Sequence, residues 1–218
     1  MDNNSKASTV GGSYKTVSRR AQASFIEKKS EFIGYIKPVG DENEAKEFIA
    51  EIRKMHPDAT HNVYAYILRG TEIARFSDDG EPSGTAGMPA LEVIKREGLT
   101  GVCVVITRYF GGILLGAGGL VRAYAKGAKV AIDEAGICEF VPFTEFDVVV
   151  EYPDYERLKR DLPVMKVKCD DVDFSGDVTL HLAIERERLE EFLAYLVDST
   201  NGRAIYEVTG ERYDGKQE

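Results

Sequence analysis

The sequence predicts an α+β protein of two domains that join near residues 137–142. Its 218 residues are enough for one large or two small domains, and 43% hydrophobic with 30% charged residues is ordinary for a globular chain. The charge is uneven, because residues 1–139 carry 18 basic and 18 acidic side chains whereas residues 140–218 carry 10 and 19. Alternating and helical hydrophobic patterns occur in both parts, which indicates strands and helices in each.

The expected compartment follows from the cysteines and from the apolar stretches. Residues 1–13 are polar and have no apolar core, so we expect a disordered leader and not a secretory signal. Cys103, Cys138 and Cys169 are an odd number without a C-x-x-C motif, which favours a reducing compartment. No segment is apolar over the roughly 20 residues that a bilayer requires. We therefore expect a cytoplasmic protein without a membrane partner.

The first domain, residues 14–139, is expected to combine strands with three helices. Asp41 with Glu44 three residues later resembles a capping box, and Pro57 should end the helix that follows. The continuous β-branched run 102–107 is typical of a central strand buried on both faces. The other expected elements are extended segments at about 14–25 and 31–39, strands at 62–68 and 74–76, a helix from Pro89 to Gly98, and a helix over 120–131 that ends at Gly136.

The second domain, residues 140–218, shows the order β-α-β-β-α-β of a ferredoxin-like fold. Residues 165–170 and 178–184 alternate in hydrophobicity on either side of a turn at Ser175-Gly176, which predicts a hairpin. Between Leu189 and Val197 the apolar side chains recur at helical spacing instead. The remaining expected elements are a strand at 141–151, a short helix at 155–160 and a last strand from about 203 to 211.

The most unusual segment joins the buried strand to the following helix and is rich in glycine. Glycines permit positive φ and close approach of a ligand or another backbone, and free N–H groups at a helix start favour an anion such as phosphate. Arg108 and Arg122 flank the segment and can bond phosphate in a bidentate way. The alternative is that the glycines only permit tight packing, since neither the G-x-G-x-x-G nor the P-loop pattern is present. The candidate phosphate-binding or nucleic-acid-binding residues are Arg108, Gly111, Gly112, Gly116, Gly118, Gly119 and Arg122, supported by Tyr109 and Tyr124.

A second candidate segment is the polar loop from Arg75 to Gly87, which carries three carboxylates and three hydroxyls. Carboxylates this close can hold a hard cation through water, or one of them can act as a base. The alternative is a solvated turn in which Ser83 or Thr85 caps the next helix. The candidate catalytic residues are Asp78, Asp79, Glu81 and His61, and the supporting loop residues are Arg75, Ser77, Ser83 and Thr85. His56 and His61 alone make a poor zinc site, and the sequence predicts no resident metal or cofactor.

Four segments, in chain order, resemble the IMPACT/YigZ family and cover most of residues 14–136. They are His61–Tyr66, Ser77–Gly87, Thr107–Gly112 and Leu115–Tyr124. The second domain is similar, more weakly, to the C-terminal half of bacterial YigZ-type members. The resemblance implies a first domain like the second domain of ribosomal protein S5 and a second like the ferredoxin-type end domain of elongation factor G, two relatives that contact ribosomal RNA. Eukaryotic IMPACT proteins regulate translation initiation with an additional RWD domain, and from the resemblance we expect a bacterial YigZ-type member without that domain.

Two hypotheses from different classes stay open at this point, with protein–protein scaffolding as a third. The first is a protein that binds RNA, the ribosome or translation factors and regulates translation, with the arginine-flanked glycine loop on phosphate. The second is an enzyme acting on a phosphorylated small molecule or nucleotide, in which the acidic loop binds a divalent cation or supplies a base. The neutral first domain can still present one basic face, whereas the acidic second domain opposes non-specific nucleic-acid binding. Both hypotheses expect the acidic loop and the glycine loop on the same face of the first domain.

Overall fold

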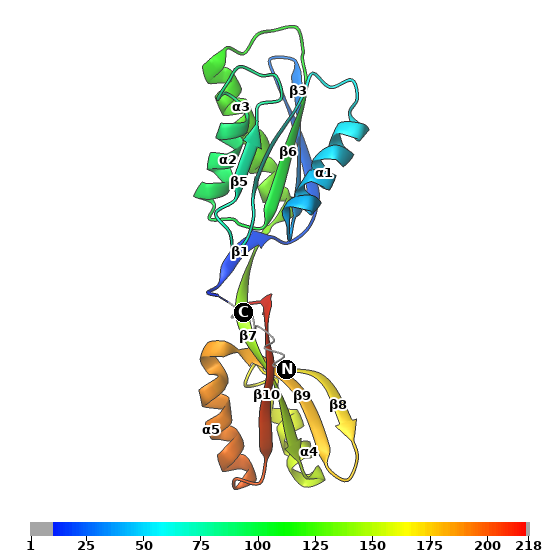
Figure 1. Ribbon diagram of the computed structural model, residues 1–218, viewed down its shortest axis with the longest axis vertical. Coiled ribbons are helices and arrows are strands. Elements are labelled where there is room, and N and C mark those ends of the chain that lie inside the picture. Colours follow the sequence, from blue (N-terminus) through cyan, green and yellow to red (C-terminus); the bar gives the residue numbers. More distant parts are fainter. Residues whose placement is uncertain (1–10, 217–218) are drawn as a thin grey trace, which may run out of the picture. The chain divides into compact units, whose positions relative to one another are not determined.

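The computed structural model describes residues 11–216. Residues 1–10 of the expected leader therefore lie outside the described residues. Two compact units divide the chain, one over Tyr14–Glu139 and the other beginning at Phe140. Each unit has its own hydrophobic core between helices and a sheet (Figure 1). None of the helices in the described residues has the length and apolar character needed to cross a membrane. The predicted two-domain α+β architecture is confirmed.

The first unit holds a five-stranded sheet in the order β2-β3-β6-β4-β5, with every neighbouring pair antiparallel. Its strands are β2 (Ala21–Glu27), β3 (Ser30–Pro38), β4 (His61–Ile67), β5 (Ala74–Ser77) and β6 (Val102–Tyr109). Its helices are α1 (Glu42–Met55), α2 (Gly87–Arg96) and α3 (Ala117–Ala135). Helices cover both faces of the sheet, α1 on one and α2 with α3 on the other (Figure 1).

Strand β6 is central and buried on both faces, as its β-branched sequence predicts. Val104 and Ile106 belong to the core on the α2 and α3 side, whereas Cys103 and Val105 belong to the core on the α1 side. Side chains alternate between the faces of a strand. Arg108 therefore points to the α2 and α3 side and the next residue to the α1 side, which decides the place of each candidate site residue at the end of β6.

Helix α3 packs on the sheet through small residues, so that two backbones nearly touch. A Cβ added to Gly34 on β3 would lie 2.3 Å from the carbonyl oxygen of Gly127 on α3. Ala128 and Ala131 continue the same buried face of the helix. The close approach fixes the position of α3, and with it the place where the glycine-rich segment enters the helix at Gly116.

The second unit has the ferredoxin-like order β10-β7-β9-β8, again antiparallel, with α4 and α5 packed on the sheet. Its elements are β7 (Ile137–Val150), α4 (Tyr152–Asp161), β8 (Lys168–Phe174), β9 (Val178–Glu185), a 3-10 turn (Arg186–Arg188), α5 (Leu189–Thr200) and β10 (Ile205–Gly215). Phe146, Leu158, Leu182 and Phe192 form the centre of its core. The predicted order of strands and helices is confirmed.

Three boundaries differ from the expectations. The extended segment at 14–25 is two strands, because the chain bends after β1 (Tyr14–Val17), which pairs with β7. Strand β7 begins at Ile137, so the expected junction at 137–142 lies inside a continuous strand and is not a loop. Strand β8 begins at Lys168 and not at residue 165, because Lys166 adopts a left-handed turn conformation with φ of 53°.

Candidate functional site

One pocket of the first unit lies where the acidic loop and the glycine-rich segment meet. Its cavity of about 380 Å³ lies near the first residue of β4, the last residues of β6 and the start of α3. The lining residues are Thr60, His61, Glu81, Pro82, Arg108, Phe110, Leu114, Leu115, Gly116, Ala117 and Leu120. Both candidate loops therefore contribute to one face of the domain, and we call this cavity the central pocket.

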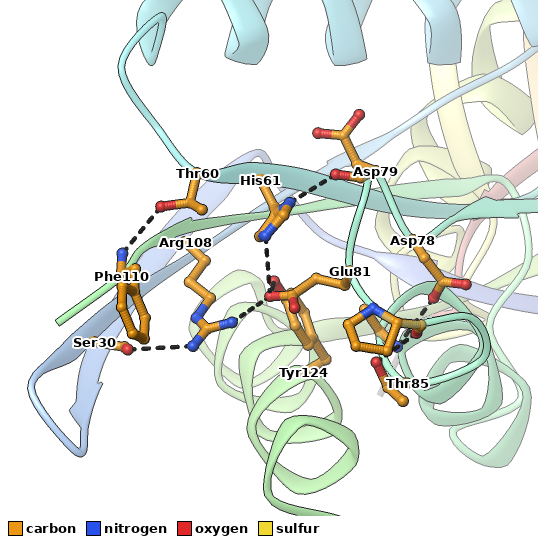
Figure 2. Close-up of polar contacts among 12 residues, drawn as sticks. Ser30, Thr60, His61, Asp78, Asp79, Glu81, Thr85, Arg108, Phe110 and Tyr124 are labelled. Atoms are coloured by element: carbon orange, nitrogen blue, oxygen red, sulfur yellow. Dashed lines mark hydrogen bonds and ion pairs between the residues drawn. The ribbon is translucent and has the colours of Figure 1, made fainter. Parts of the chain in front are cut away.

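A buried ion pair between Glu81 and Arg108 lies at the central pocket (Figure 2). Arg108 Nη1 donates to Glu81 Oε1 at 2.5 Å, and the side chains are 6% and 4% exposed respectively. The Tyr124 hydroxyl donates to the same oxygen at 2.8 Å. Burial, and then the neighbouring Glu81 carboxylate, raise the pKa of Tyr124 far above its ordinary value, so Tyr124 remains a donor. Such partners are what a carboxylate needs to remain ionised away from water.

The Arg108 guanidinium also lies between aromatic rings and keeps one donor unused. Its carbon is 5.4 Å from the ring centre of Phe32 and 5.5 Å from that of Phe110. Nη2 donates to the Ser30 hydroxyl at 3.4 Å, a long contact. Nε is buried and has no hydrogen-bond partner among the described residues. The ion pair therefore neutralises the charge of Arg108 without satisfying the whole guanidinium.

His61 is oriented by the backbone of the acidic loop. Its Nδ1 lies 2.7 Å from the carbonyl oxygen of Asp79, and because a carbonyl only accepts, Nδ1 carries a proton. Nε2 then faces Glu81 Oε1 at 3.7 Å. Asp79 itself has a left-handed backbone, and its carboxylate accepts from the Asn62 amide and from Arg53, both at 2.6 Å. Asp79 thus positions His61 and does not line the central pocket.

Asp78 is a structural residue of the loop. Its carboxylate accepts hydrogen bonds from the amides of Gly84, Ala86 and Gly87 at 2.8, 3.0 and 2.8 Å, and so satisfies donors at the start of α2. The expectation that Ser83 or Thr85 caps this helix is wrong, because the Thr85 hydroxyl donates to the Pro82 carbonyl and no side chain of the N-cap residue bonds.

The alternative in which the three carboxylates hold a cation together is also corrected. Asp78 binds amides, Asp79 pairs with Arg53, and Glu81 pairs with Arg108, so the three do not converge. Within residues 11–216 no cluster of three or more His, Cys, Asp or Glu side chains is arranged to hold a metal ion. Of the four catalytic candidates, only His61 and Glu81 line the central pocket.

The candidate glycines divide by role. A Cβ on Gly111 would lie 2.0 Å from the carbonyl of Lys29, so this glycine permits contact with the β2–β3 turn. Gly116 has φ of 74° and is the N-cap residue of α3 at the central pocket. Gly112 and Gly118 line neither the central pocket nor the second hollow described next. The glycines therefore shape the loop more than they form a single anion cradle.

Arg122 lines a second hollow of about 200 Å³, on the other side of Leu115. Lys28 and Lys126 line it as well, together with Glu27 and the Gly119 backbone. The two arginines therefore do not flank one anion site, contrary to the expectation. Lys28 and Lys126 were not among the residues expected at the site, although Arg122 and Lys126 have the i, i+4 spacing that places two side chains on one face of a helix.

The remaining supporting residues lie away from the central pocket. Arg75 and Ser83 are exposed, and the Ser77 hydroxyl accepts from the amide of Asp79. The Tyr109 hydroxyl contacts His56 Nδ1 at 2.8 Å on the α1 side of the sheet. The site residues that the sequence did not indicate are Ser30, Phe110 and Leu114, whose proximity to Arg108 or Glu81 depends on the fold alone.

Comparison with known proteins gives matches over both units. Residues 28–132 match the Impact N-terminal domain, and residues 148–203 match a domain of unknown function, DUF1949. The IMPACT family member YvyE of Bacillus subtilis (strain 168) is 37% identical, over 88% of this chain and 89% of its own length. YigZ of Escherichia coli (strain K12) is 35% identical, over 80% and 87%. A crystal structure of a hypothetical protein has a TM-score of 0.59 at 32% identity and covers 90% of this chain and 97% of that chain.

Proposed function

Because this chain belongs to the IMPACT family, we propose that it binds RNA of the translation apparatus in the cytoplasm and regulates translation. The contact surface is a basic patch on the first unit, made of Lys28, Lys29, Arg122 and Lys126. A patch of this kind binds phosphate groups, and contacts with phosphates dominate the affinity of proteins for nucleic acids.

The observation that carries the proposal is the absence of acidic partners in the basic patch. Among the described residues, no ion pair involves Lys28, Lys29, Arg122 or Lys126. Several other cations of the same unit do form ion pairs, as Lys129 does with Glu97 and Asp133, whereas the four cations of the patch are gathered in one place without any. Three cations line the second hollow against the single carboxylate of Glu27, and Gly119 in the first turn of α3 adds its backbone.

The β2–β3 turn supports the same interpretation. Lys28 and Lys29 are the two central residues of this hairpin, and both have positive φ, 46° and 66°. This turn type favours asparagine and glycine, and a left-handed side chain costs about 1–2 kcal/mol per residue. Lysines at both positions add two exposed cations to the patch in spite of that strain, and strained residues concentrate at functional sites.

Arg108 has a different role in this proposal. Its charge is neutralised by Glu81 and its side chain is buried, so it holds the acidic loop against the end of β6 and contributes no net charge to phosphate binding. The proposed phosphate contacts therefore come from the basic patch alone. The net charge of −9 in residues 140–218 keeps non-specific affinity low, so binding depends on the first unit.

The test is the salt dependence of binding to a fluorescent single-stranded RNA of about 12 nucleotides, within the usual site sizes. The double variant Arg122→Gln and Lys126→Gln should bind more weakly, and the magnitude of the slope of log affinity against log salt should fall by about 0.7 per lost contact, the value for single strands. Lys95→Gln, which removes a charge paired with Glu92, is the control and should leave both quantities unchanged. Equal slopes for the double variant and the control would refute the proposal.

One observation favours the alternative, an enzyme acting on a phosphorylated small molecule or nucleotide. The central pocket holds buried Glu81 and Arg108 beside His61, although no cation site accompanies them. This alternative predicts that free nucleotides raise the melting temperature at concentrations where RNA does not. A reduced salt slope in the double variant would therefore support RNA binding, whereas a melting temperature raised by free nucleotides would support the enzyme.

A further inference from the structure

We propose that the central pocket receives one unpaired nucleobase of the RNA strand whose phosphates lie on the basic patch. The inference rests on the proposed function and specifies what that function recognises. It follows from three features of the pocket: its walls, its polar floor, and its continuity with the basic patch.

The walls are apolar and partly open to solvent. Phe110, Leu114, Leu115 and Leu120 line a cavity of about 380 Å³, within the usual range for small-molecule sites. The Leu114 side chain is 81% exposed and that of Phe110 is 46% exposed, in a unit that otherwise buries its leucines. A base is flat with apolar faces, and unpaired bases stack on aromatic side chains. The exposed ring and leucine at the pocket provide such a surface.

The floor supplies both a donor and an acceptor and opposes an anion. Among residues 11–216, the polar contacts of the Glu81 side chain fall on Oε1, which leaves Oε2 as an acceptor for the N–H groups of a base edge. Arg108 Nε is the matching donor, since it is buried without a partner among the described residues. A base edge carries donors and acceptors side by side, so it can satisfy both groups. A phosphate cannot, because the Glu81 carboxylate repels it.

The central pocket and the basic patch meet at one residue. Leu115 lines both the central pocket and the second hollow. The start of α3 also contributes to both, with Gly116 at the central pocket and Gly119 and Arg122 at the second hollow. A nucleotide with its base in the central pocket therefore has positive charge next to it for a phosphate. A base within a duplex is already paired and stacked, so this arrangement selects single strands.

The test uses the full chain with Leu114→Ala and Phe110→Ala, and the same RNA of about 12 nucleotides in single-stranded and duplex form. Phe110→Ala should lower the affinity for the single strand by about 5- to 100-fold, the range found when an aromatic stacking partner is removed. Leu114→Ala, which removes an apolar contact and no aromatic ring, should lower it by a smaller factor. The affinity for the duplex and the salt slope should stay as in the wild type, because no phosphate contact is lost. Val164→Ala, which shortens an 82% exposed side chain of the second unit, is the matched control.

The outcomes separate this inference from the proposed function. Unchanged single-strand binding by both pocket variants, with reduced binding by the Arg122 and Lys126 variant, overturns the base pocket and keeps the basic patch. An equal loss on duplex and single strand also overturns it. If mononucleotides bind as tightly as the strand, the base in the central pocket does not have to belong to RNA, and this result overturns the inference and favours the enzyme. Absence of RNA binding by the wild type overturns both proposals. Melting temperatures of all variants show whether a loss reflects unfolding.

Discussion

Glu81 and Arg108 are opposite charges in direct contact and almost without water. A buried pair of this kind contributes little net stability relative to apolar residues, yet removal of one partner leaves a charge that the interior cannot solvate. Tyr124 and Ser30 add hydrogen bonds that hold the pair in place. The Glu81–Arg108 ion pair therefore attaches the acidic loop to the end of β6.

We expect Glu81→Gln to lower the free energy of unfolding by about 3–5 kcal/mol, because it leaves Arg108 buried without a counter-charge. Urea titration measures the change. Glu92→Gln breaks the half-exposed pair with Lys95 and should cost no more than about 1 kcal/mol. Similar losses in the two variants would show that the guanidinium finds another partner.

The sequence predicted the site residues better than it predicted their roles. It indicated Glu81, Arg108 and His61 as candidates, and the structure brings all three to one pocket. It allowed an arginine buried against Asp78, Asp79 or Glu81 but could not select Glu81 as the partner of Arg108. Their proximity depends on the β4–β6 register, in which His61 lies opposite Arg108. A pairing across 27 residues of sequence leaves no local pattern.

At the scale of elements, the contact between β3 and α3 determines where the pocket lies. Gly34 and Gly127 let strand and helix backbones approach more closely than any side chain would allow. The start of α3, with Gly116 and Leu120, is then brought to the end of β6. A change far from the pocket can therefore displace it.

Gly34→Ala should destabilise the first unit by about 1–3 kcal/mol or more, since its methyl group would overlap the carbonyl of Gly127 and the backbones must separate. Gly176→Ala is the control, because a methyl group there meets nothing within 4 Å. Thermal unfolding followed by circular dichroism measures both. A Gly34→Ala protein as stable as the control would mean that α3 shifts without loss.

Element prediction from the sequence succeeded where one physical signal dominates. β6 was predicted because its β-branched run suits only a strand buried on both faces. The break between β1 and β2 was not, because Ser18, Arg19 and Arg20 include neither glycine nor proline. That break depends on pairing between β1 and β7, which are more than a hundred residues apart in sequence.

At the scale of the whole molecule, the two units have separate cores joined by a strand. β7 pairs with β9 and β10 from Phe143 to Val149, and with β10 from Phe140 onwards. A protease requires an exposed and flexible segment, which this ladder does not offer. We therefore expect the junction to resist limited proteolysis, although the change of composition at residue 140 resembles that of a linker.

Residues 14–139 expressed alone should fold, because both cores that flank the β2–β6 sheet consist of residues from this range. We expect one cooperative transition in urea, since the cores are complete in the fragment. RNA binding should be retained and become tighter than that of the full chain at low salt, because the basic patch is present and the acidic residues 140–218 are removed. An unstructured fragment would show that the first unit needs the remainder of β7. The fragment of residues 140–218 serves as the control for RNA binding.

The unequal distribution of charge has a consequence for orientation. A polyanion repels the second unit, which carries the whole −9, while it exerts little net force on the neutral first unit and attracts its basic patch. These opposite electrostatic forces favour encounters that begin at the first unit over those that begin at the second. The difference acts over about 8 Å at physiological salt, so it matters only in the last step of an encounter. Under the proposed function, RNA is therefore met by the basic patch of the first unit, although the chain as a whole is acidic.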